Sequence, residues 1–99
     1  MATAISVVDT HAPLQLLAQY VNAKGKVVLA PAGASPNWSV SDSKLAGNAP
    51  AGLQDVVTLT GADGDFSVGF SDGTFTDSLP VSVTPDQTVA GVQIVVQNP

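Results

Sequence analysis

Pro36-Asn37-Trp38-Ser39-Val40-Ser41-Asp42 is the stretch that decides the fold of this chain. It contains the only tryptophan, and Trp38 and Val40 alternate with Ser39 and Ser41. Successive side chains of a β-strand point to opposite faces, so this alternation predicts a strand with one apolar face. We expect it to be the central strand of an antiparallel sandwich, with the Trp38 indole in the core.

The chain downstream repeats the same alternation. Phe66, Val68 and Phe70 are separated by small residues, which is the clearest strand pattern in the sequence. Asp72-Gly73 then predicts a hairpin turn into the following strand. Residues 79–84 alternate again, with a proline at position 80 that predicts an edge strand or a bulge. Further strands are expected at residues 5–9, 27–29, 56–60 and 89–96.

Upstream of the tryptophan, residues 14–22 have period-2 spacing, with every second residue from Leu14 to Tyr20 on one face. This favours a half-buried strand, and a helix is the competing interpretation because the segment holds good helix formers. A turn with Gly25 at its centre follows. Residues 30–36 and 47–52 are rich in Gly, Ala and Pro, and both are expected to be irregular loops.

Seven or eight short strands with frequent turns predict an all-β fold, an antiparallel β-sandwich. The scarcity of helix-forming charged residues agrees, since the chain has no Glu and no Arg. One domain is expected over residues 1–99, because this length supports a single core. Trp38 is expected to pack against Phe66 or Phe70 on the facing sheet. The predicted core is Leu14, Leu16, Tyr20, Trp38, Val40, Leu59, Phe66, Val68, Phe70, Val81 and Val83.

Charge and composition argue against several classes of partner. The net charge is −5 and only three residues are basic, Lys24, Lys26 and Lys44. Phosphate backbones and anionic membranes both require a basic footprint, so we expect neither nucleic acid nor membrane as a partner. The chain has no cysteine, which rules out disulfides and thiolate metal sites.

Several segments together resemble the bacterial immunoglobulin-like domain of group 2 type, found in bacterial surface proteins and phage virion proteins. Residues 16–27 resemble its second strand and turn, and Trp38-Ser39-Val40-Ser41-Asp42 resembles its Trp-Ser-x-Ser-Asp strand. Lys44-Leu45-Ala46 resembles the short segment that follows. Residues 64–70 and 79–85 are similar to its later strands, whereas residues 47–52 lack its Val-rich strand. The resemblance covers residues 14–85, and residues 86–99 are expected to be an extra C-terminal strand or a tail.

The resemblance implies that the β-sandwich is immunoglobulin-like and that its role is structural and non-enzymatic. A domain of this family that begins at its own Met1 without an export signal suits a phage virion component. We therefore expect an accessory virion protein, a capsid decoration that binds capsid or other virion proteins. Residues 89–96 either close the protein's own sheet or pair with another chain, including a second copy. The alternative is a carbohydrate- or surface-binding adhesin module at the bacterial cell surface.

No catalytic, cofactor-binding or metal-ligating residue is assigned from the sequence. His11 is the only histidine and has no partner nearby except Asp9, so a solvated loop residue is expected. The best metal candidate is Asp63-Gly64-Asp65 with Asp72 and Asp77, but no complete calcium loop is present and a structural turn is favoured. Trp38 is also a candidate platform for stacking a sugar, but its alternation with Val40 favours a position in the core. An enzyme is not expected, because no nucleophile or acid–base pair is evident.

Overall fold

Residues 2–97 form nine β-strands and no helix in the computed structural model. The predicted all-β class is therefore confirmed. Residues 1, 98 and 99 lie outside the described residues, and with them the expected start at Met1 and the last residues of the predicted tail. The strands are β1 (Ile5–Val8), β2 (Leu14–Leu17), β3 (Tyr20–Val21), β4 (Val27–Val28), β5 (Asn37–Val40), β6 (Ala46–Ala51), β7 (Gln54–Leu59), β8 (Gly64–Ser71) and β9 (Thr76–Thr84).

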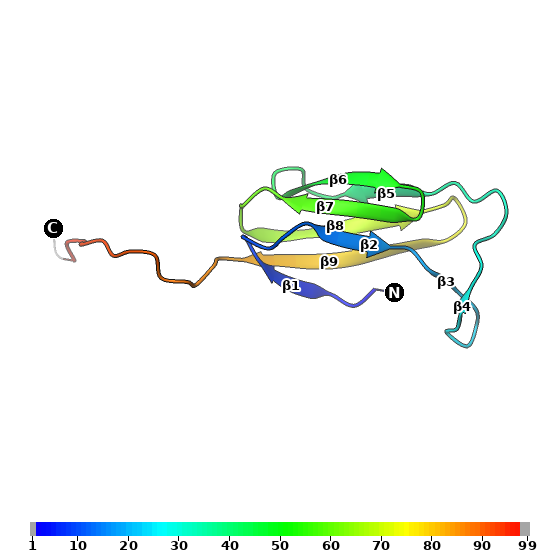
Figure 1. The fold of residues 1–99 in the computed structure, drawn as a ribbon, viewed down its shortest axis with the longest axis horizontal. Helices are drawn as coiled ribbons and strands as arrows, with labels where there is room; N and C mark the ends of the chain where they lie inside the picture. Colours follow the sequence, from blue (N-terminus) through cyan, green and yellow to red (C-terminus); the bar gives the residue numbers. More distant parts are fainter. Residues whose placement is uncertain (1, 98–99) are drawn as a thin grey trace.

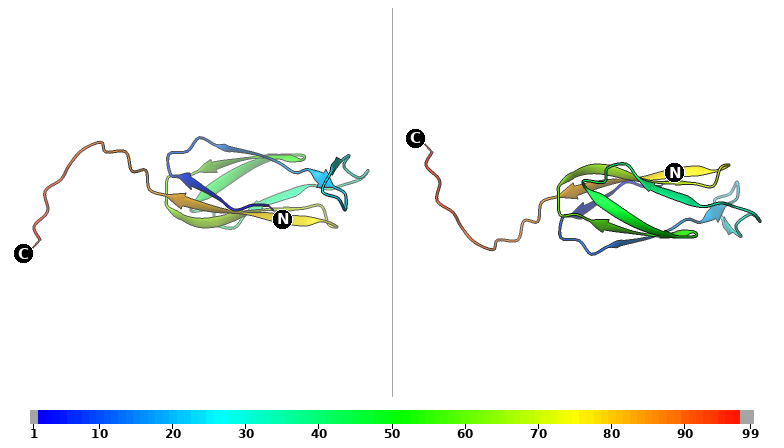
Figure 2. Two further views of the ribbon diagram at one scale, coloured as in Figure 1. Left: turned by 90° about the horizontal axis from the view of Figure 1, so that it is seen from below. Right: turned by 90° about the horizontal axis from the view of Figure 1, so that it is seen from above.

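The strands form two layers with a small hairpin at one end (Figures 1 and 2). One sheet has the order β1-β9-β8-β5 and the other has the order β2-β7-β6. Strands β3 and β4 make a separate two-stranded ribbon. All pairs are antiparallel except β1 with β9, which run parallel from Ile5↔Val81 to Val8↔Thr84. The architecture is that of a β-sandwich with four strands facing three.

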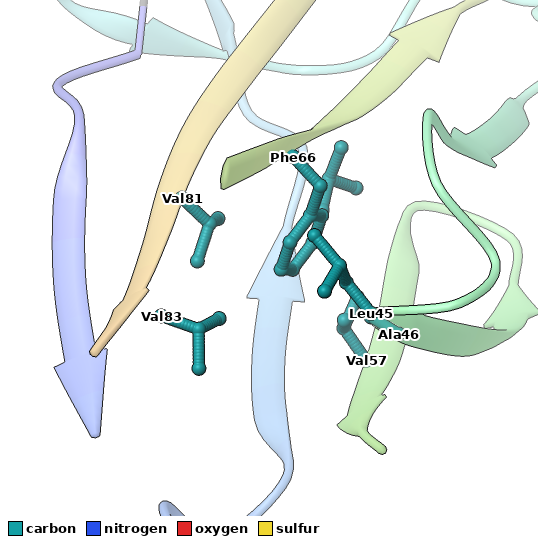
Figure 3. Close-up of a cluster of buried hydrophobic side chains, with 7 residues drawn as sticks. Leu45, Ala46, Val57, Phe66, Val81 and Val83 are labelled. Atoms are coloured by element: carbon teal, nitrogen blue, oxygen red, sulfur yellow. The ribbon is translucent and has the colours of Figure 1, made fainter. Parts of the chain in front are cut away.

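The core lies between the sheets, where alternate residues of β7, β8 and β9 point inward. Its buried members are Leu45, Ala46, Val57, Phe66, Val68, Val81 and Val83. Figure 3 shows Phe66, Val81 and Val83 from the larger sheet pointing toward Val57 and the segment before β6. Phe66, Val68, Val81 and Val83 were predicted from their alternation and are confirmed. Leu45, Ala46 and Val57 were missed.

The position of the tryptophan strand differs from the prediction. Strand β5 pairs only with β8 and is the edge strand of the larger sheet, not a central strand. Phe70 does pack against Trp38, with ring centroids 5.0 Å apart at an interplanar angle of 64°. The two residues are cross-strand partners in the same sheet, not residues of facing sheets. The reason is that alternating apolar and polar residues indicate which face of a strand is buried, but not how many strands pair with it.

The predicted loop at residues 47–52 was also wrong, because Ala46–Ala51 forms β6. Its Gly, Asn, Ala and Pro residues have low strand propensity, yet six consecutive residues pair with β7. Strand β6 is the last strand of its sheet, and an edge strand tolerates Pro50 because one side of it needs no donor. Pairing with β7 thus overrides the local preference.

Strand β9 explains the proline at position 80. The strand lies between β1 and β8, but β1 pairs only with residues 81–84. Strand β9 is therefore an inner strand and not the predicted edge strand, but Pro80 itself lies before the residues that pair with β1. On the other side it faces Ser67, whose N–H donates to Ser41 Oγ (2.8 Å) and whose carbonyl accepts from Ser41 N (2.9 Å), so β8 requires no donor from Pro80.

In the remaining segments, the structure can be compared with the predicted strands and turns. Residues 14–22 are extended, as favoured over a helix, and split into β2 and β3. The turn after them has Gly25 at φ +79°, with Asn22 Oδ1 accepting from Lys24 N and Lys26 N. The hairpin turn at Asp72-Gly73 joins β8 to β9. Residues 85–97 form no strand and leave the sandwich as an extended tail (Figure 1).

Candidate functional site

An apolar cavity of about 360 Å³ opens between the two sheets at one end of the sandwich. The segment from β2 to β3 forms one wall and the start of β9 forms the other. Trp38 and Phe70 line it from within the larger sheet. The full lining is residues 16–21 and 75–79 with Ala2, Trp38, Val68 and Phe70.

Trp38 presents its ring to this cavity while its polar atom is already used. The indole Nε1 donates to the Gly52 carbonyl at 3.0 Å, which ties β5 to the β6–β7 turn. The ring packs edge-on against Phe70 and is half-buried against the core. A tryptophan whose N–H is satisfied contributes apolar surface to a cavity at little cost. The Trp38 side chain therefore packs at the edge of the core and also lines the cavity.

Asp72 does not itself line the cavity, but it holds two residues that do, Tyr20 and Phe75. Its Oδ1 accepts from Thr74 N (2.8 Å) and Phe75 N (2.7 Å), and its Oδ2 accepts from the Tyr20 hydroxyl (2.5 Å). The Phe75 N–H bond first, then the Tyr20 hydroxyl and the Thr74 N–H, lower the pKa of Asp72. The same bond to Asp72 raises the pKa of Tyr20, with reduced hydration and the carboxylate charge adding to it. Tyr20 is thus held as a hydrogen-bond donor and is poorly suited to proton transfer.

The acidic residues considered as a metal candidate do not come together. Asp63 and Asp65 lie at the start of β8, whereas Asp72 follows its other end and Asp77 on β9 opposes Phe70 near that end. Asp77 Oδ1 accepts from Ala2 N (3.1 Å) and from Ser78 N (2.9 Å). Within residues 2–97, no three His, Cys, Asp or Glu side chains gather closely enough to hold a metal ion.

Asp63 is brought instead to Asp9, across the end of the sandwich. Reduced hydration first, and then the hydrogen bond and charge repulsion with the Asp9 carboxyl group, raise the pKa of Asp63. A raised native pKa means that the folded protein is destabilised once this carboxyl group ionises. This pair was not foreseen, because the two residues are far apart in sequence. His11 lies in the exposed loop after β1, with its Nδ1 2.5 Å from the Ala12 carbonyl oxygen.

Replacing Asp63 with Asn is expected to raise the melting temperature at neutral pH. The unfavourable contribution of Asp63 is absent below the ordinary aspartate pKa and complete above the raised native pKa, so the gain should disappear in acid. Thermal melts of wild type and Asp63→Asn across this pH range measure it. Asp65→Asn removes the same charge two residues away and is the control. Equal gains in both variants would contradict a specific Asp9–Asp63 repulsion.

Sequence reasoning also missed Asp55, the one buried charged residue among those described. It is 1% exposed on β7, its Oδ2 accepts from Asn48 Nδ2 at 2.9 Å, and its Oδ1 has no partner within the described chain. Asp55 is in phase with Val57 and Leu59, so extending the alternation of the predicted strand by one step would have placed it inside. It does not line the cavity.

Comparison of the chain with protein-family models, with curated proteins and with solved structures finds no match in any of the three. Residues 2–97 contain no helix with the length and apolarity needed to cross a membrane. The surface of this fold is therefore the guide to its function. What that surface offers is an apolar cavity, an exposed apolar tail, and polar groups that are engaged in turns.

Proposed function

We propose that this protein is a non-enzymatic accessory structural protein of a phage virion, a capsid decoration protein that attaches through apolar surface. The observation that carries the proposal is uncovered aliphatic surface on a small β-sandwich. Val92 and Ile94 in the tail are 98% and 97% exposed, and Leu29 near the opposite end is 94% exposed. Exposed apolar surface beyond scattered single residues is typical of proteins that dock onto others.

We also propose that the sandwich is immunoglobulin-like, as the resemblance at residues 14–85 implies. The strand order supports this assignment. In immunoglobulin domains the second, fifth and fourth strands form one sheet, while the third, sixth and seventh form the other. If β1 is the first strand and the β3–β4 ribbon is an excursion, β2-β7-β6 and β5-β8-β9 have that order.

The chemistry of the surface supports a structural role over catalysis. The Tyr20 hydroxyl is bonded to Asp72, and His11 stands in an exposed loop apart from any nucleophile described above. The net charge of −5 disfavours nucleic acid and anionic membranes, so a protein surface is the expected partner.

Fractionation of the source culture tests the virion role. Particles purified on a density gradient should carry this chain, as detected with an antibody, and should retain it in high salt because apolar contacts are not screened. Purified protein should also rebind to particles from which it has been stripped. Detection only in the cell envelope, with no rebinding to particles, would overturn the proposal.

One feature favours the alternative role of a carbohydrate-binding adhesin module. Tyr20, Trp38 and Phe75 all line the cavity, Phe75 is 58% exposed, and it packs edge-on against Tyr20 with centroids 6.1 Å apart. Aromatic faces beside polar groups are a common means of holding sugars. A glycan array with Phe75→Ala as the control distinguishes the two roles, since particle attachment predicts no glycan signal to lose.

A further inference from the structure

The three-stranded sheet has an open edge along β2. Strand β2 ends the order β2-β7-β6, so one of its sides has no neighbouring strand within residues 2–97. Ala18 N donates to Leu53 O (2.8 Å), which continues the β2–β7 register in which Leu16 opposes Asp55. Antiparallel hydrogen-bonded positions alternate, so Leu14, Leu16 and Ala18 use their backbone groups toward β7. The N–H and C=O groups of Gln15 and Leu17 then point toward the open edge.

The apolar cavity lies beside this same edge. Residues 16–19 form its wall on the β2 side, and Leu79 lies on the β9 side. The larger sheet has four strands, whereas the smaller sheet has three. A strand added beside β2 would therefore satisfy backbone groups and place its inward side chains over the cavity. Unpaired backbone groups and an uncovered apolar surface are both features of a sheet that lacks a strand at its edge.

The C-terminal tail has the properties of the strand that is missing. Val92, Ile94 and Val96 fall in one phase, and Gln93, Val95 and Gln97 fall in the other. Residues 87–97 carry no charge in a chain whose net charge is −5, so docking the tail brings no like charges together. The tail is extended, and its aliphatic side chains are largely exposed. Segments with high strand propensity and no charge readily pair with an available edge.

We propose that residues 89–96 of one copy add to the outer edge of β2 in a second copy, with Val92, Ile94 and Val96 over the cavity. The segment matches residues 14–21 in length, so it can cover the whole side from β2 to β3. The contact is β-augmentation, in which backbone hydrogen bonds give affinity and alternate side chains give register. It stands independently of the virion role.

The placement of the two surfaces favours a second copy over the tail of the same chain. The tail leaves at Thr84, the end of β9, whereas the cavity is lined by the start of β9. Figures 1 and 2 show the tail leading away from the sandwich at the end opposite the β3–β4 hairpin. Different surfaces on the two partners make the contact head-to-tail, which allows open chains of copies.

Sedimentation velocity of the full chain over a range of concentrations tests the proposal. The wild-type protein should grow from the 9.9 kDa monomer to dimers and longer species. Ile94→Asp places a charge on the docking phase of the tail and should lose every species heavier than the monomer. Val95→Asp adds the same charge on the opposite phase and should assemble like the wild type. A wild-type protein that stays monomeric throughout, or an Ile94→Asp variant that still assembles, would overturn the proposal.

A second variant blocks the other half of the contact. Gln15→Pro removes an outward N–H from β2 without removing a bond to β7. Circular dichroism of the variant is the check that it folds. Gln15→Pro alone should be monomeric. Mixed with Ile94→Asp, which keeps an intact edge, it should form a one-to-one complex that does not grow further, because each partner retains one working surface. Failure of the mixture to form this complex, while the wild type assembles, would show that the tail and the β2 edge are not partners.

Discussion

Replacing Phe66 with alanine is expected to lower the free energy of unfolding by about 3–5 kcal/mol, the range measured for buried phenylalanines. Phe66 is 5% exposed, lies opposite Val81 on β9 and belongs to the buried cluster that joins the two sheets. Its removal would leave a void in the middle of a small core that has few other large side chains. Natural domains have a total stability of about 5–15 kcal/mol, so the variant should be marginally folded.

Urea denaturation followed by circular dichroism measures this loss. Phe75→Ala is the matched control, since it removes the same side chain from a position that is 58% exposed. Phe75 packs edge-on against Tyr20, a contact worth about 0.5–1.5 kcal/mol, and the control should lose no more than a similar amount. Equal losses for the two variants would mean that the core is not organised around Phe66.

Replacing Asn48 with alanine is expected to cost about 1.5–3 kcal/mol, the range for hydrogen bonds to charged groups. Asn48 Nδ2 donates the single side-chain hydrogen bond described for Asp55, which is 1% exposed. Asp55 Oδ1 is already without a partner within the described chain. The variant would leave both oxygens of a buried carboxyl group unpaired, and burying such a group without partners is costly.

A double-mutant cycle isolates the charged contribution of this pair. Asp55→Asn keeps an oxygen that can accept from Asn48 but removes the negative charge. In that background Asn48→Ala should cost about 0.5–1.5 kcal/mol, the usual range for a neutral hydrogen bond. Chemical denaturation of the four proteins gives the coupling directly. The same cost in both backgrounds would show that Asn48 acts through packing on β6 and not through the carboxyl group.

Where one face of a strand is buried and carries apolar side chains, the sequence predicted both the strand and its inward residues. Phe66 and Val68 on β8, and Val81 and Val83 on β9, are examples, because period-2 alternation follows directly from strand geometry. The turns at Gly25 and Asp72-Gly73 were predictable for a similar reason, since local chemistry determines them.

Features that depend on pairing between distant segments were not predictable from local patterns. Strand β6 exists because β7 pairs with it along its length, although its own residues are poor strand formers. Leu45 and Ala46, just before and at the start of β6, belong to the buried hydrophobic cluster. The edge position of β5 depends on which strands follow in the sheet, which a single alternating stretch does not encode. The Asp9–Asp63 pair and the cavity likewise arise from the packing of segments far apart in sequence.

The parallel pairing of β1 with β9 has a mechanical consequence. Because the two strands run in the same direction, tension between the start of β1 and the end of β9 pulls them along their axes in opposite senses. The hydrogen bonds between β1 and β9, over the register from Ile5↔Val81 to Val8↔Thr84, are then loaded in shear. They bear the force at the same time and do not open one after another. A chain held at its two ends would therefore resist extension at the seam where its first and last strands meet.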